Sequence, residues 1–249
     1  MKKDAAASAA GADDIFESLA VFNIDRDKLV MGHKLNPKTF NGKISADGKD
    51  FDGNGKMDNH FNNVAWVVVK EDLNVGDVIA DNLDNMVVVG KGTTFTRTDD
   101  ERVSVADNGA NTMAIKGGLA HKMGNGEELS FSVISGFVAN LKISEADINK
   151  HASATTAQRG VYGGVVGKME GNAILYAVGV KGELSVGGTT QLILGGISGL
   201  TESGAIIECY QDVDMTYRAA ENGHAAGITT YMTGYTFTRN VYSSGRIET

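Results

Sequence analysis

Oxygen-bearing side chains at regular spacing between positions 50 and 58 are the clearest sign of chemistry in this chain. The candidate metal ligands, at loop positions one, three, five, seven and nine, are Asp50, Asp52, Asn54, Lys56 (through its backbone carbonyl) and Asp58. Hard oxygen donors at this spacing suit Ca²⁺, so we expect weak calcium binding. An EF-hand needs a glutamate at position twelve, where this chain has Phe61, so the pattern is closer to the compact calcium loops of extracellular β-rich repeats. A metal-free acidic turn is the alternative interpretation.

A second pair of carboxylates, Asp212 and Asp214, alternates along a predicted strand and so shares one face. Paired carboxylates catalyse glycoside hydrolysis, and β-helical enzymes that degrade polysaccharides take such groups from neighbouring coils. The five histidines show no metal-binding spacing, and the sequence has no nucleophile elbow and no complete phosphate-binding loop. Because alternating carboxylates are common on a solvated strand face, we prefer that interpretation and expect no catalytic activity.

Charge and composition narrow the classes of partner. The formal net charge of −8 is spread along the chain, and no lysine–arginine cluster is interleaved with aromatic residues, which argues against nucleic-acid binding. The sequence contains no run of about 18 apolar residues that could span a membrane. The single cysteine, Cys209, lies in an apolar stretch and is expected to be a buried, unreactive core residue.

A threefold repeat predicts the strands that would position the candidate site residues. Its copies are Gly163-Gly164-Val165-Val166-Gly167, Gly195-Gly196-Ile197-Ser198-Gly199 and Ala226-Gly227-Ile228-Thr229-Thr230. Their central aliphatic residues are 32 and 31 residues apart, a period typical of the stacked coils of a solenoid. The residues expected to point into the stack are Val165, Ile174, Ile197, Ile206 and Ile228.

A tyrosine follows each copy of the repeat at a roughly constant distance: Tyr176, Tyr210 and Tyr242. At equivalent positions of successive coils these rings would stack in a ladder, which stabilises parallel coils. A sugar-binding aromatic strip is the functional alternative. We prefer the structural ladder because stacking alone requires such repetition.

Glycine and proline usage favours the same architecture. The chain has 32 glycines and one proline, as expected where nearly every strand is central and corners need the positive φ that glycine supplies. Short strands are predicted at 64–69, 86–89, 102–105, 112–115, 129–134 and 137–143. A short helix is predicted over 13–22, and a loop or helical turn extruded from the stack over 145–158.

Two stretches resemble a known repeat. Tyr162-Gly163-Gly164-Val165-Val166-Gly167, followed by Gly171-Asn172-Ala173-Ile174-Leu175-Tyr176, is similar to the GLUG motif, and 203–210 is similar to its second half. The resemblance covers roughly residues 131–247. It weakens in the third copy, at Ala226 and Thr230, which leaves the register of the last coil open. The resemblance implies a right-handed parallel β-solenoid on a bacterial surface or secreted adhesin-like protein.

The sequence therefore predicts an all-β chain in two parts. Residues 1–63 would form a turn-rich lead-in or cap with the candidate calcium loop, and residues 64–249 the solenoid. The expected function is that of an extracellular or cell-surface adhesin-type module that binds a host or cell-surface glycan or protein without catalysis, a conclusion that rests on fold analogy. The alternatives are a polysaccharide-degrading enzyme on the same scaffold and a self-associating fibre or appendage subunit.

Overall fold

The described part of the chain is built from β-strands alone. The computed structural model describes residues 29–31, 65–69, 71–75, 80–83, 86–98, 114–124, 131–147, 159–188, 191–219 and 223–249. Their strands form three sheets of twelve, five and four strands, which confirms the all-β prediction for these ranges. The helix predicted over 13–22, the calcium loop over 50–58 and the strand over 102–105 lie outside the described residues.

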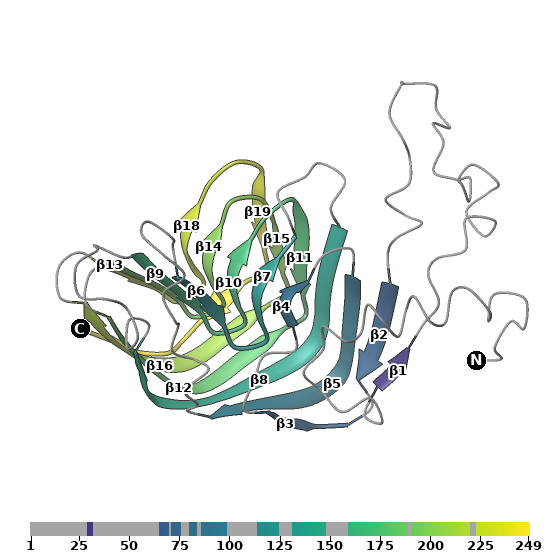
Figure 1. Ribbon diagram of the computed structural model, residues 1–249, viewed down its shortest axis with the longest axis horizontal. Helices are drawn as coiled ribbons and strands as arrows, with labels where there is room; N and C mark the ends of the chain where they lie inside the picture. Colours follow the sequence, from purple (N-terminus) through teal and green to yellow (C-terminus); the bar gives the residue numbers. More distant parts are fainter. Residues whose placement is uncertain are drawn as a thin grey trace, which may run out of the picture.

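The twelve-stranded sheet is called here the large sheet. Its strands are β1 (Leu29–Met31), β2 (Ala65–Val69), β3 (Leu73–Val75), β5 (Met86–Thr98), β8 (Phe131–Asp147), β11 (Asn172–Tyr176), β12 (Gly179–Gly188), β15 (Gly204–Ile207), β16 (Tyr210–Ala219), β19 (Thr236–Arg239), β20 (Tyr242–Ser243) and β21 (Ile247–Glu248). In Figure 1 its strands β3, β5, β8, β12 and β16 lie along the base of the molecule, and its strands β11, β15 and β19 lie in the upper part. The main order is β1-β2-β5-β8-β11-β15-β19, with β12 and β16 continuing from β8. β1 is antiparallel to β2, and the other described pairs are parallel.

Two smaller parallel sheets complete the fold. The five-stranded sheet has the order β18-β14-β10-β7-β4 and the four-stranded sheet the order β17-β13-β9-β6. The bounds of these strands are β4 (Ala80–Leu83), β7 (Ala120–Met123), β10 (Val166–Met169), β14 (Ser198–Thr201), β18 (Thr229–Met232), β6 (Ala114–Gly117), β9 (Arg159–Gly163), β13 (Gln191–Gly195) and β17 (Gly223–Ala226).

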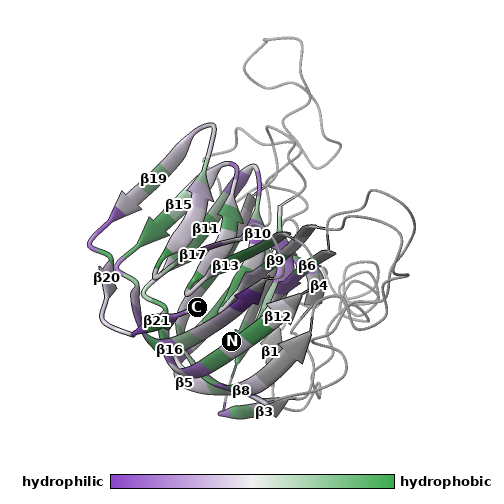
Figure 2. Cartoon of the chain, turned by 90° about the vertical axis from the view of Figure 1, so that its left-hand side faces the viewer, coloured by the Kyte–Doolittle hydropathy of each residue, from purple (hydrophilic) through white to green (hydrophobic). Residues whose placement is uncertain are grey.

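The chain visits the three sheets in a fixed order. We call each circuit a pass: β9, β10, β11 and β12 form one pass, and β13, β14, β15 and β16 form the next in the same sheets. Val166 pairs with Ser198 and Ser198 with Thr229, which are steps of 32 and 31 residues. Successive passes lie side by side in Figures 1 and 2. The last pass keeps this register, so the substitutions in the third repeat copy do not displace it.

A recurring backbone bend divides the large sheet. Strand β8 pairs with β11 through its first part and with β12 through its last, so two predicted strands, 129–134 and 137–143, are one continuous strand. At the bend a residue with positive φ recurs from pass to pass: Lys91, Gly136, Ala177, Glu208 and Asn240. Four of these five residues carry a side chain, although this conformation favours glycine.

The apolar core lies inside the stack of passes. Val165, Ile197 and Ile206 are fully buried as predicted, and Ile228 of the last pass is partly buried against them. Cys209 is also buried as predicted, and its thiol donates to the carbonyl of Leu175 at 3.6 Å. Burial raises the pKa of the Cys209 thiol, which keeps it protonated and unreactive.

The inward assignment of Ile174 is wrong by one residue. Leu175, not Ile174, pairs with the buried Ile206, and Leu175 is itself fully buried. Ile174 pairs with Ala205, and both are only partly buried. Because side chains alternate between the two faces of a strand, a shift of one residue exchanges inside and outside.

The paired glycines of the repeat are required by close approach between passes. An ideal Cβ on Gly164 would lie 2.2 Å from the carbonyl oxygen of Gly196, and one on Gly196 would lie 2.2 Å from that of Gly227. The amide of Gly164 also donates to Gly195 at 3.0 Å. None of these glycines has a positive φ. The expectation that the repeat needs glycine here for a positive φ is therefore wrong.

An additional copy of the repeat core precedes the three recognised in the sequence. It is Gly117-Gly118-Leu119-Ala120, and the amide of Leu119 donates to the carbonyl of Val165 at 2.7 Å. These two residues lie 46 positions apart, whereas Val165 and Ile197 lie 32 apart. The register divides the 14 additional residues: five lie between β7 and β8, one at a bulge in β8 and eight between β8 and β9. Strand β8 continues to Asp147, so the prediction of an extruded segment over 145–158 is wrong at residues 145–147, and residues 148–158 lie outside the described ranges.

Candidate functional site

The carboxylate pair considered for catalysis lies on the outer face of β16. Asp212 and Asp214 are exposed, and Val213 between them is buried, as the predicted alternation requires. Asp212 Oδ1 accepts from Ser244 Oγ at 2.7 Å, and Asp214 Oδ1 accepts from the amide of Arg246 at 3.2 Å. Both carboxylates therefore join the last two passes, which is a structural role.

The predicted tyrosine ladder forms only in part. Tyr210 pairs in register with Tyr242, but Tyr176 pairs with Ile207. The sequence separation explains the error, because Tyr176 and Tyr210 are 34 residues apart and the passes are 31 or 32 residues long. All three tyrosines are exposed.

The five-stranded and four-stranded sheets meet at a closely packed corner. An ideal Cβ on Gly199 would lie 2.5 Å from Val161 Cγ1, and one on Gly167 would lie 2.6 Å from Ile115 Cγ2. Side chains of the four-stranded sheet therefore pack on glycines of the five-stranded sheet. A side chain on Gly167 or Gly199 would clash with these groups, whereas Thr230, at the same position of the last pass, fits and donates to the carbonyl of Leu194 at 2.7 Å.

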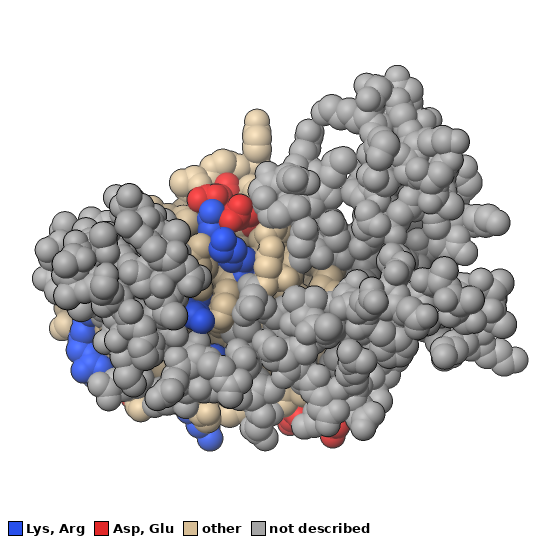
Figure 3. All heavy atoms as spheres, viewed as in Figure 1, with Lys and Arg blue, Asp and Glu red and all other residues tan. Residues whose placement is uncertain are grey.

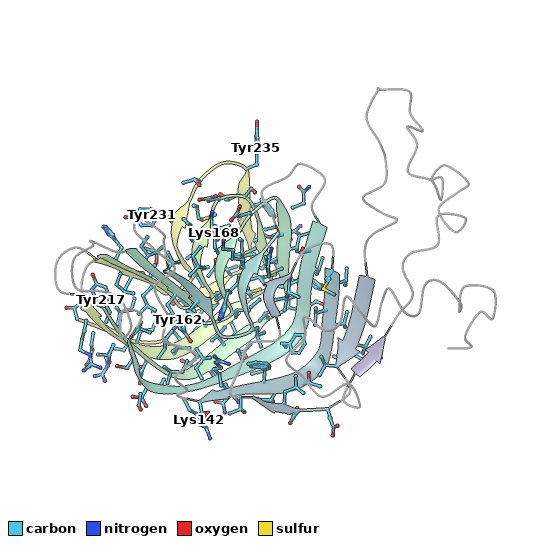
Figure 4. All side chains as sticks on the ribbon, viewed as in Figure 1. Lys142, Tyr162, Lys168, Tyr217, Tyr231 and Tyr235 are labelled. Atoms are coloured by element: carbon cyan, nitrogen blue, oxygen red, sulfur yellow. The ribbon has the colours of Figure 1, made fainter. Side chains whose placement is uncertain are left out.

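A row of side chains crosses the five-stranded sheet beside this corner. Lys168, Leu200 and Tyr231 occupy the same register position in β10, β14 and β18. Lys168 Nζ lies 2.8 Å from Glu170 Oε1 and 2.9 Å from Glu202 Oε2. Figure 3 shows acidic and basic side chains side by side on this face, and Figure 4 shows Lys168 and Tyr231 over these strands.

The charges of this group hold it in one arrangement. Burial lowers the pKa of Lys168, but the hydrogen bonds and negative charges of Glu170 and Glu202 outweigh burial, so the net shift is upward. The lysine is therefore a permanent cation between two carboxylates. The side chain of Glu202 is 45% exposed, whereas that of Glu170 is 17% exposed, so Glu202 is the carboxylate that a ligand meets first.

An aromatic pair continues the row into the four-stranded sheet. The rings of His224 and Tyr231 lie 5.2 Å apart in an edge-to-face arrangement. We call Lys168, Glu170, Glu202, His224 and Tyr231 the corner face. Tyr231 lies two strands from Lys168, with Leu200 of β14 between them. A tyrosine ring on the same sheet as these ion-paired groups provides a stacking surface and directional hydrogen bonds, which suits a polar, hydroxyl-rich ligand.

The corner face has a signal in the sequence, although none of its residues was among the predicted site residues. Glu170 and Glu202 lie 32 residues apart, the period of the repeat, and each follows its Gly-Gly core by the same distance. Recurrence of a charged residue at the repeat period indicates a row across a sheet. The candidate calcium ligands, in contrast, lie outside the described residues, within which no group of three or more His, Cys, Asp or Glu side chains could hold a metal ion.

The comparisons with protein-family models, with curated proteins and with solved structures give no match to this chain. Within the described ranges no helix has the length and apolar character needed to cross a membrane. Function must therefore be argued from the sheets and the corner face themselves.

Proposed function

We propose that this chain is a right-handed parallel β-solenoid of the GLUG type that serves as an adhesin-type binding module on the outside of a bacterial cell. The parallel register of 31–32 residues and the fixed order of sheets support the solenoid. The antiparallel strand β1, from the predicted lead-in, covers the first edge of the large sheet, which supports a capping role for that region.

The corner face is the proposed binding surface, and a glycan is the proposed ligand. The observation that carries this choice is the position of Tyr231 in one row with the Lys168–Glu170–Glu202 ion-pair cluster. Aromatic rings bind the apolar faces of sugars, and flanking charged groups hydrogen-bond their hydroxyls. The ion pairs fix those groups before the ligand arrives, which lowers the entropic cost of binding.

A panel of immobilised glycans tests this function with the purified chain. We expect saturable binding to at least one glycan, a loss of at least tenfold in affinity for Tyr231→Ala, and a smaller loss for Glu202→Gln. Tyr242→Ala is the matched control, because Tyr242 is an exposed tyrosine of the large sheet. No binding to any glycan, or an equal loss in the control, would refute the proposal. Release of soluble sugars would instead indicate the polysaccharide-degrading alternative.

A fibre subunit is the second candidate function, favoured by the last pass. Strands β17, β18, β19, β20 and β21 each pair on one side only with described strands, and no described strand pairs with their other edges. Large apolar side chains are exposed there: Tyr231, Met232, Tyr235, Phe237, Tyr242 and Ile247. Electron microscopy of the concentrated protein tests this candidate. Filaments that vanish with Phe237→Lys would support it, and a monodisperse particle would exclude it.

A further inference from the structure

Arg97 occupies an inward position of β5 that later passes fill with apolar residues. It pairs in register with Leu141 of β8, and the position continues through Gly182 to the buried Val213. The Arg97 side chain is 1% exposed. A guanidinium group remains protonated in proteins, so a positive charge is buried inside the stack.

The buried guanidinium lacks acceptors in the described part of the chain. Its Nε and Nη1 atoms are both buried and make no hydrogen bond there. The ion pairs between described residues involve Lys168 and Arg246, not Arg97. Buried donors are nearly always paired, and an unpaired buried ion is strongly destabilising. The interior at Arg97 therefore requires acceptor oxygens.

Lys116, Tyr162 and His121 lie in the two smaller sheets. Lys116 pairs in register with Tyr162, whose side chain is fully buried in the core (Figure 4). Lys116 Nζ lies 3.1 Å from His121 Nε2. Burial and the positive charges of Lys116 and Arg97 lower the pKa of His121 to about 3, so this imidazole is neutral at neutral pH. Both cations thus lie close enough to act on one histidine.

We propose that the interior at Arg97 binds a small oxyanion, namely a carboxylate, phosphate or sulfate group. These groups share the oxygen acceptors that a guanidinium recognises, so one of them would pair the buried Nε and Nη1 atoms of Arg97. The proposal does not depend on the corner face, because it concerns inward side chains.

Thermal unfolding of the full chain at matched ionic strength tests the site. The probes are inorganic phosphate, sulfate, acetate and glucuronate, with chloride as the reference; the glucuronate arm distinguishes a sugar acid from a free ion. We expect the Tm to rise by roughly 5–10 °C when phosphate exceeds its Kd about a hundredfold. Arg97→Leu should fold, because leucine fills the same position in β8, and should lose the rise. Arg218→Leu is the control, because Arg218 is exposed, and should keep it.

Two outcomes would overturn the proposal. One is a Tm in the wild-type protein that rises no more with the oxyanions than with chloride. The other is an equal rise in Arg97→Leu. Calorimetric titration of phosphate into the wild-type protein gives an answer even if Arg97→Leu does not fold, since the absence of saturable heat would show that the guanidinium is neutralised by the chain itself.

Discussion

The amide of Val165 donates a hydrogen bond of 2.9 Å to the carbonyl of Ile197, its counterpart 32 residues later. The amide of Ile197 then donates to Ile228 at 3.0 Å, so the central residues of the repeat copies are joined in a continuous ladder. The backbone carbonyls of each copy accept hydrogen bonds from the amides of the copy before it. Stability is therefore expected to depend on the contacts between passes more than on any single pass.

The first prediction concerns the glycine at the corner. Gly164→Ala should destabilise the protein by about 1–3 kcal/mol, because the added Cβ meets the backbone oxygen of Gly196. Gly164→Pro should cost more, since it also removes the amide that donates to Gly195. Gly227→Ala is the matched control: its Cβ would meet the Ser243 side chain, which can move, so the loss should be smaller. Equal losses in urea denaturation at Gly164 and Gly227 would contradict this account.

The second prediction tests which residue of β11 faces the core. Leu175→Ala should cost about 2–5 kcal/mol, because Leu175 is fully buried. Ile174→Ala should cost clearly less, since Ile174 is partly exposed. Chemical denaturation of both variants measures the difference. A larger loss for Ile174→Ala would mean that the described register of β11 is wrong.

The third prediction concerns the bend between β11 and β12. Ala177 has a φ of 52°, a conformation that costs a residue with a side chain roughly 1–2 kcal/mol. Ala177→Gly should remove this strain and, after the entropic cost of glycine, raise the stability by up to about 1 kcal/mol. Ala173→Gly is the control; Ala173 is buried in β11, so this change should lower stability. A loss of stability in Ala177→Gly would argue against a strained bend.

The fourth prediction concerns pH. Because the pKa of His121 falls from 6.5 to about 3 on folding, the unfolded chain binds a proton that the folded chain does not between these values. Stability should therefore be constant above about pH 6.5 and decrease toward pH 3, with a total loss on the order of 4 kcal/mol from this group.

Denaturation of the wild-type protein and His121→Gln in phosphate-free buffer separates this effect from the titration of carboxylates. The glutamine variant should lose less stability between pH 6.5 and pH 4. Parallel curves for the two proteins would show that His121 titrates normally.

The fifth prediction concerns the loop at 50–58. Calcium should raise the Tm and a chelator should lower it, because the predicted loop would place the carboxylates of Asp50, Asp52 and Asp58 together, where a cation would neutralise their repulsion. Asp52→Ala should abolish the difference. The affinity should be weak, on the order of 10⁻⁴–10⁻³ M, since a twelfth-position carboxylate is missing. Calorimetry at millimolar calcium with no heat would identify the loop as an acidic turn.

The sequence by itself determined the strand content and the repeat. Scarcity of proline, the 31–32-residue spacing and the Gly-Gly cores are local properties, and each constrains the backbone directly. The same spacing predicted the burial of Val165 and Ile197 correctly, since both lie within an invariant part of the copy.

Only the tertiary structure decided which face of a strand each side chain occupies beyond the repeat core. It also decided which residues come together in each site. Met169 pairs with Thr201 but Leu175 with Ile206, so the turn before β11 is one residue longer than the turn before β15, and counting from the repeat core misassigned Ile174. Tyr176 lies before the bend at Ala177 and Tyr210 after the bend at Glu208, so the two do not pair. Arg97 and His121 are far apart in sequence, and only the folded chain brings the charge of one to the other. A repeat fixes which backbone atoms pair, but contacts between different sheets depend on packing across the core, which no local sequence pattern specifies.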